Sequence, residues 1–100
     1  MVSLRVLVVY DIGDNTIREE FARKLQQLGL ERIQRSCFLG RGGLDLVKTV
    51  ARVAERLIDV KKDVVHVFPL DEYSFKYAKC VGRPTNLVEI EGVTYVRSGL

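Results

Sequence analysis

The chain has 100 residues, of which 47% are hydrophobic and 29% are charged, and its formal net charge is +3 at pH 7. This composition excludes a disordered chain and is typical of a single small globular domain, which we expect to span residues 1–100. No apolar run approaches the roughly 18 residues that a membrane helix needs, so we expect a cytoplasmic protein without a membrane partner. The positive charge mildly favours an acidic partner such as nucleic acid.

The first half of the chain predicts a strand, a helix and more extended chain. Residues 4–12 are β-branched and apolar at both parities, which is typical of a strand buried on both faces. Residues 16–28 have helical periodicity, with capping side chains available at positions 14–16. Residues 31–39 alternate as extended chain, which is either one kinked strand or two short ones.

The second half repeats this alternation. A second helix, which Asp45 can cap, is expected to run to about Asp59. A third buried strand begins near Asp63, and Pro69 is expected to end it. Residues 87–96 alternate again and predict a last strand or a short hairpin about their glycine.

This order of elements predicts an α+β fold, a ferredoxin-like sandwich in which an antiparallel sheet carries both helices on one face. Two helices cover only one face of the sheet, yet the strand at residues 4–12 is apolar on both. Something must therefore cover the second face, and in so short a chain we expect a second copy of the protein. The sequence thus predicts a homodimer through the face that lacks helices.

Asp11 and Arg18 depart from the local rules of strand and helix. Asp11 ends a strongly apolar strand, although other side chains lie closer to the helix start and can cap it. Arg18 lies in the first helical turn, where the helix dipole disfavours a cation. We expect the two to lie close together and either to pair or to face an outside ligand such as a metal-bound phosphate. Magnesium needs only one or two carboxylates, so two copies of Asp11 across a dimer axis could share a site; otherwise Asp11 is a capping or turn residue.

Several basic residues could follow a nucleic-acid backbone. Arg32 and Phe38 lie on the polar side of the extended chain, where they either contact phosphate and stack on a base or form a dimer interface with Phe38 as packing. A stripe of basic residues spaced by four marks the second helix, and such a stripe is usually only a solvated face. The expected nucleic-acid-binding residues are Arg18, Arg32, Arg35, Lys48, Arg52 and Arg56.

The stretch "VVYDIGDNTIREEFARKLQQLGLERIQRSCF" resembles the N-terminal half of the CRISPR-associated Cas2 family, the small dimeric partner of the CRISPR integrase. The residues that carry the resemblance are Tyr10, Asp11, Ile12, Asp14, Arg18 and the Arg-Ile-Gln-x-Ser-x-Phe pattern from Arg32 to Phe38. It implies a ferredoxin-like homodimer that acts in CRISPR spacer acquisition, with each C-terminal strand added to the partner's sheet. It also implies a metal-dependent endonuclease of the hydrolase class that cuts single-stranded RNA or double-stranded DNA.

The resemblance implies roles for individual residues. Asp11 is the expected ligand of magnesium or another divalent metal. The other expected members of the catalytic group are Tyr10, Arg18, Arg32 and Phe38. Glu20 is acidic where some relatives have a second arginine, and this weakens the inference of strong nuclease activity.

Three classes of function remain open on the sequence alone. In the enzyme interpretation, Asp11 binds magnesium and directs water at a phosphodiester. In the adaptor interpretation, the dimer is a basic platform that holds nucleic acid and the integrase, and Asp11 is structural. A ferredoxin-like regulatory domain that binds a small ligand is the third class, and no small-molecule motif supports it.

Overall fold

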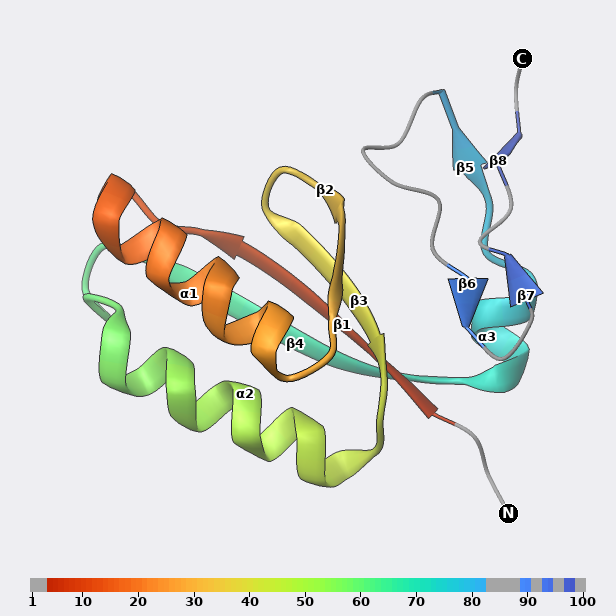
Figure 1. Ribbon diagram of the computed structural model, residues 1–100, viewed down its shortest axis with the longest axis horizontal. Coiled ribbons are helices and arrows are strands. Elements are labelled where there is room, and N and C mark those ends of the chain that lie inside the picture. The colour runs from red at the N-terminus through yellow and green to blue at the C-terminus, as the bar shows by residue number, and fades with distance from the viewer. Residues whose placement is uncertain (1–3, 83–88, 91–92, 95–96, 99–100) are drawn as a thin grey trace.

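The computed structural model describes residues 4–82, 89–90, 93–94 and 97–98. The elements in chain order are β1 (Leu4–Asp11), α1 (Asn15–Gln27), β2 (Glu31–Gln34), β3 (Cys37–Arg41), α2 (Leu44–Leu57), β4 (Val64–Asp71), α3 (Glu72–Lys76), β5 (Cys80–Val81), β6 (Glu89–Ile90), β7 (Val93–Thr94) and β8 (Arg97–Ser98) (Figure 1). The extended chain at 31–39 is therefore two strands, the second of the two alternatives. None of the helices in the described ranges has the length and apolar character needed to cross a bilayer.

The four long strands form one antiparallel sheet in the order β2-β3-β1-β4. Both α1 and α2 pack against the same face of this sheet (Figure 1). This arrangement confirms the predicted α+β, ferredoxin-like fold. Strand β1 lies at the centre, because it pairs with β3 along one edge and with β4 along the other.

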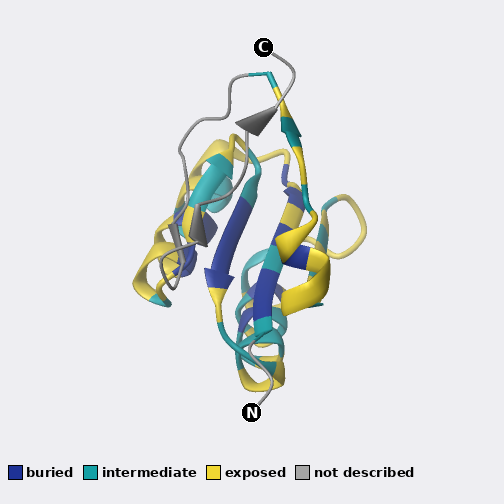
Figure 2. Cartoon of the chain, turned by 90° about the vertical axis from the view of Figure 1, so that its right-hand side faces the viewer, coloured by how far each residue is buried: buried dark blue, intermediate teal, exposed yellow. Residues whose placement is uncertain are grey.

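Alternate side chains of β1 enter the layer between the sheet and the helices. Val6, Val8 and Tyr10 are buried there against Phe21 of α1 and Val50 of α2. Figure 2 shows buried positions along the strands of the sheet and exposed positions on the outer sides of the elements. Burying one large apolar side chain of this kind contributes roughly 1.5–3 kcal/mol, so this layer is the main source of stability.

The opposite face of the sheet is partly covered by α3. Phe75 is 5% exposed and packs with Leu39 on this face. Arg5 is buried beside them, with its guanidinium carbon 4.7 Å from the centre of the Phe75 ring. Here α3 of the same chain covers the region where a second copy was expected to lie.

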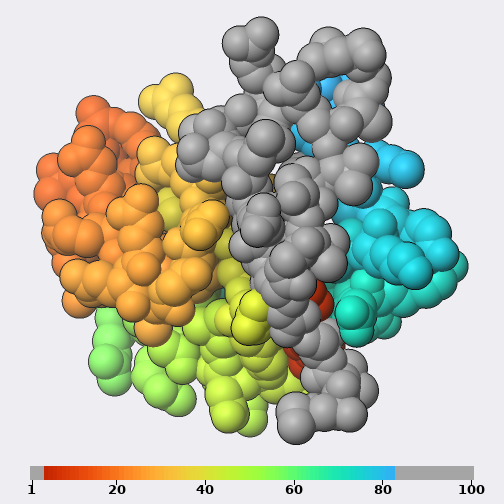
Figure 3. All heavy atoms as spheres, turned by 45° about the vertical axis from the view of Figure 1, so that its right-hand side comes forward, coloured from red at the N-terminus to blue at the C-terminus, as the bar shows by residue number. Residues whose placement is uncertain are grey.

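The rest of this face stays exposed within one chain. Val9 is 36%, Val64 43% and Phe68 47% exposed. In Figure 3 the atoms of the α3 segment and those of α1 lie on opposite sides of the view. An apolar area thus remains on the face that lacks α1 and α2, and the prediction of a homodimer through it stays a prediction.

The starts of the two long helices differ in how they are capped. The Asp14 carboxylate accepts a hydrogen bond of 2.9 Å from the Ile17 amide and caps α1. For α2 the predicted cap at Asp45 is wrong, because the helix already begins at Leu44 and Gly43 occupies the cap position. Asp45 lies instead in the first turn, where an acidic side chain is favoured by the helix dipole.

Pro69 does not end β4, contrary to the prediction. The strand continues to Asp71, and Pro69 lies opposite Val6 of β1. β4 is an edge strand of the four-stranded sheet, so a residue without an N–H is tolerated when that position faces the unpaired side. Farther along, β6 and β7 pair antiparallel, which confirms the hairpin alternative; Gly92 itself lies outside the described residues.

Replacing Phe21 with Ala should lower the free energy of unfolding by about 3–5 kcal/mol, because the ring is fully buried and packs edge-on against Tyr10. Urea denaturation followed by circular dichroism at fixed protein concentration measures the change. Val60→Ala is the control, since Val60 is 72% exposed and its truncation should change stability by less than about 0.5 kcal/mol. Similar losses in the two variants would contradict the assignment of the core.

Candidate active site

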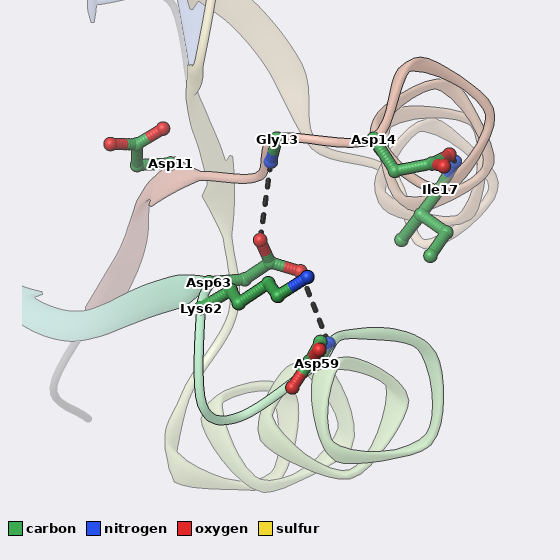
Figure 4. A pocket seen from close by; sticks show the side chains of 7 residues that line it. All are labelled: Asp11, Gly13, Asp14, Ile17, Asp59, Lys62 and Asp63. Atoms are coloured by element: carbon green, nitrogen blue, oxygen red, sulfur yellow. Dashed lines mark hydrogen bonds between the residues drawn. The ribbon is translucent and has the colours of Figure 1, made fainter.

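The end of β1 presents the carboxylate of Asp11 to solvent. Asp11 pairs with Val64 of β4, and by alternation its side chain leaves the sheet on the face opposite Tyr10. It is exposed and forms no hydrogen bond or ion pair with another residue in the described part of the chain. Figure 4 shows the carboxylate pointing away from Asp14, Asp59 and Asp63. Asp11 is therefore free to bind an external ligand.

The turn that follows Asp11 is held at each of its residues. Ile12 is 2% exposed, and its carbonyl accepts a hydrogen bond of 2.8 Å from Nη1 of Arg18. The Gly13 amide donates to Oδ1 of Asp63 at 3.1 Å. The next residue, Asp14, is the cap of α1. The free carboxylate thus sits on a backbone that is fixed from both the helix and the neighbouring strand.

Arg18 is directed away from Asp11. Its guanidinium donates to the Ile12 carbonyl and to the side-chain oxygen of Asn15. Of the two arrangements expected for this acid and base, the ion pair does not form. The two oxygen acceptors also explain how a cation is accommodated in the first turn of a helix, where the dipole disfavours it.

Three of the predicted nucleic-acid-binding arginines line one recess. It has a volume of about 170 Å³ and is lined by Arg18, Glu19, Arg32 and Arg35. The turn between β2 and β3 reaches this place because the Tyr10 amide donates to the Ser36 carbonyl at 3.0 Å. The arginine recess therefore lies at the same end of β1 as Asp11, and its guanidinium groups are suited to a phosphate.

Tyr10 and Phe38 belong to the core beside the arginine recess. Their rings stack with centroids 6.2 Å apart, and the guanidinium carbon of Arg32 lies 5.1 Å from the centre of the Phe38 ring. Because Phe38 is fully buried, it is not available to stack on a base, and the structure favours its alternative role in packing. Tyr10 is 4% exposed, so both residues support the site from below.

The hydroxyl of Tyr10 is buried close to the guanidinium group of Arg32. Burial raises the pKa of Tyr10 above its ordinary value, and the nearby guanidinium groups of Arg32 and Arg18 act in the opposite direction. The neutral phenol is therefore the form that the folded protein favours.

An acidic hollow adjoins Asp11 on its other side. It has a volume of about 470 Å³ and is lined by Asp11, Gly13, Asp14, Ile17, Asp59, Lys62 and Asp63 (Figure 4). Sequence reasoning missed the last three of these residues. The available signal was the polar run from Asp59 to Asp63, but only the pairing of Asp11 with Val64 brings that run against the end of β1.

Most carboxylates of the acidic hollow are already engaged. Asp14 caps α1, Asp63 accepts from two backbone amides, and Asp59 accepts from the Lys61 amide at 3.0 Å. No group of three or more potential metal-ligating side chains exists among the residues described here. A single exposed carboxylate such as Asp11 is compatible with magnesium, which keeps several waters and takes only one or two carboxylates.

The basic stripe on α2 is separate from the arginine recess. Lys48, Arg52 and Arg56 are exposed and form no ion pair within the described ranges. These side chains lie on a solvent-exposed face of α2, which is accessible to a nucleic-acid backbone. On α1, the carboxylate of Glu20 pairs with Arg23.

Sequence comparison decides the family. The sequence model of the family described as CRISPR associated protein Cas2 matches residues 4–78. The chain belongs to the Cas2 family. The match runs from β1 through α3, so it includes Asp11, the arginine recess and Asp63.

Individual Cas2 relatives agree with this assignment. A CRISPR-associated endoribonuclease Cas2 of Aeropyrum pernix is 36% identical over 77 residues, which are 77% of this chain and 84% of the relative. A CRISPR-associated endonuclease Cas1/endonuclease Cas2 fusion of Thermoproteus tenax is 39% identical over 67 residues, 67% of this chain and 25% of the fusion. The crystal structure of a hypothetical protein from Thermus thermophilus superposes with a TM-score of 0.62 at 29% identity, over 92% of this chain and 94% of that one.

Tyr10→Phe should remove a pH dependence from the stability of this Cas2 protein. Because the folded-state pKa of Tyr10 is raised, its contribution is fully present below the ordinary pKa of 10.0 and is lost as the pH rises through the folded pKa. Denaturation from pH 8 to 11 measures the unfolding free energies of wild type and Tyr10→Phe. Their difference should stay constant up to about pH 10, and above that pH wild type should lose stability relative to Tyr10→Phe. A constant difference over the whole range would show that Tyr10 ionises as easily in the folded state as in the unfolded one.

Proposed function

We propose that this Cas2 protein is a magnesium-dependent endoribonuclease that acts as a homodimer in CRISPR spacer acquisition, together with the Cas1 integrase. The observation that carries the proposal is the free carboxylate of Asp11 at a fixed strand end, with a recess of three arginines at the same end of β1. The endoribonuclease name of the Aeropyrum pernix relative supports RNA as the substrate. The Cas1/Cas2 fusion of Thermoproteus tenax supports Cas1 as the partner. A protein that acts on cellular RNA and in CRISPR spacer acquisition would work in the cytoplasm.

The residues of the site have different roles in the hydrolysis of a phosphodiester. Arg18, Arg32 and Arg35 bind phosphate oxygens and face the negative charge that grows during hydrolysis. Asp11 would hold the divalent ion, which would supply an activated water and polarise the phosphate. Tyr10 and Phe38 do not touch the substrate; they support Arg32 and the end of β1 from the core.

The homodimer is proposed through the sheet face that lacks α1 and α2. Val9, Val64 and Phe68 are large apolar residues exposed on this face, and a second copy would remove them from water. By strand alternation Asp11 shares this face with Val9. A symmetric contact there brings together the faces that carry the two copies of Asp11, which supports a shared site with one carboxylate from each chain.

A non-catalytic adaptor is the second candidate function. The exposed basic stripe of Lys48, Arg52 and Arg56 favours it, because these residues suit a nucleic-acid backbone and lie apart from Asp11. Glu20 adds to this, since it contributes a negative charge, paired with Arg23, to the helix that carries Arg18. In this interpretation Asp11 is structural.

Asp11→Asn should lower the rate of magnesium-dependent cleavage of single-stranded RNA by well over tenfold, a barrier increase of more than about 1.4 kcal/mol, because the variant keeps the shape but loses the ligand charge. Cleavage of a labelled RNA is measured with magnesium and with a chelator. Asp59→Asn is the matched control from the same hollow and should cleave within about twofold of wild type. Equal rates for wild type and Asp11→Asn would refute the catalytic assignment, and support of integration without cleavage by either protein would favour the adaptor.

Val9→Lys should dissociate the homodimer, because it would bury an unpaired charge in the proposed interface. Sedimentation velocity at micromolar concentration is the measurement. Leu44→Lys is the control, since Leu44 is 59% exposed at the start of α2, and this variant should remain a dimer. A wild-type chain that sediments as a stable monomer would contradict the proposed interface.

A further inference from the structure

The carboxylate of Asp63 joins two loops that are far apart in the sequence. Its Oδ1 accepts from the Gly13 amide at 3.1 Å, and its Oδ2 accepts from the Asp59 amide at 3.1 Å (Figure 4). The first bond reaches the turn between β1 and α1, and the second reaches the end of α2. Each oxygen of the carboxylate therefore has its own backbone donor.

The register of the sheet explains why Asp63 is the residue in this place. Asp11 is the last residue of β1 and lies opposite Val64, the first residue of β4. Asp63 comes just before Val64, so it reaches the chain just beyond Asp11. It holds Gly13 on one side of the turn, while Arg18 holds the Ile12 carbonyl on the other.

We propose that Asp63 is a positioning residue for Asp11: by binding the Gly13 amide it fixes the backbone that carries the free carboxylate. This inference rests on the proposed role of Asp11 as a metal ligand. A metal ligand must be held closely in its productive place, and residues that orient a ligand affect metal affinity although they do not touch the ion. Asp63 is suited to this because its carboxylate offers two acceptors and no donor.

The chemistry of this carboxylate supplies a sharp variant. Asparagine has one oxygen and one NH₂ group, so Asp63→Asn can keep one of the two bonds, whereas Asp63→Ala has no side-chain acceptor and loses both. Asp59→Asn is the matched control, because it removes the same charge from the same hollow. Among the described residues, the Asp59 side chain accepts one hydrogen bond, from the Lys61 amide, and asparagine can keep that bond.

Amide hydrogen exchange and a magnesium titration test the proposal on the isotopically labelled full-length protein by NMR. Asp63→Ala should raise the exchange rate of the Gly13 amide at least tenfold and weaken the magnesium midpoint seen at the Asp11 resonance at least threefold. Asp59→Asn should change both by less than twofold. In RNA cleavage, Asp63→Ala should lower kcat at least fivefold with KM within twofold, since the arginine recess is untouched.

Each other outcome overturns the inference in a distinguishable way. An unchanged Gly13 exchange rate in Asp63→Ala would show that Asp63 does not hold the turn. If the Gly13 amide exchanges faster in the Asp63 variant but the magnesium midpoint equals that of Asp59→Asn, then Asp63 joins the two loops without affecting the metal site. If wild type shows no magnesium response at Asp11, the proposed metal role fails and the positioning role fails with it, whatever the exchange rates are.

Discussion

The double pairing of β1, with β3 along one edge and β4 along the other, is the constraint on which the candidate site depends. The pairing with β4 continues through Asp11, whereas the pairing with β3 ends at Val9 and is followed by the hydrogen bond from the Tyr10 amide to Ser36, so the last residues of β1 are held in register mainly by β4. Tyr10 is thereby fixed toward the helices and Asp11 toward the opposite face. The same pairing draws Ser36 to Tyr10 and Asp63 to Gly13, and so assembles both sides of the site around one strand end.

The two sides of this strand end carry different chemistry. On the helix side, Arg18 and Arg32 are placed by α1 and β2 over a buried aromatic floor, and they offer positive charge to a phosphate. On the other side, Asp11 offers negative charge to a cation and has no partner in the described part of the chain. A phosphodiester that engages both must lie across the tip of β1. In the proposed mechanism, substrate binding and metal binding would therefore depend on separate side chains, and the proposed dimer through the open face would leave the arginine recess accessible.

Features that depend on neighbours in the sequence were predictable, and those that depend on the register were not. The central strand followed from β-branched residues at both parities, and Asp11 stood out because it ends that strand. The contact of Asp63 with Gly13 spans fifty positions and exists only because of the way β4 pairs with β1. Local propensity also misread Asp45 and Pro69, because the start of α2 and the edge position of β4 decided their roles. For the same reason the covering of the sheet by Phe75 had no signal in the local pattern.

The central claim is that the fixed end of β1 offers Asp11 to a divalent ion next to a phosphate held by the arginine recess. Anomalous diffraction from crystals of the protein grown with manganese, used in place of magnesium, and a phosphorothioate RNA tests it most directly. The account predicts an anomalous peak about 2.1 Å from the Asp11 carboxylate, the distance at which magnesium binds oxygen, with a phosphate lined by Arg18, Arg32 and Arg35. A metal bound at Asp59 or elsewhere, with Asp11 still exposed to solvent and the arginine recess without a phosphate, would contradict it.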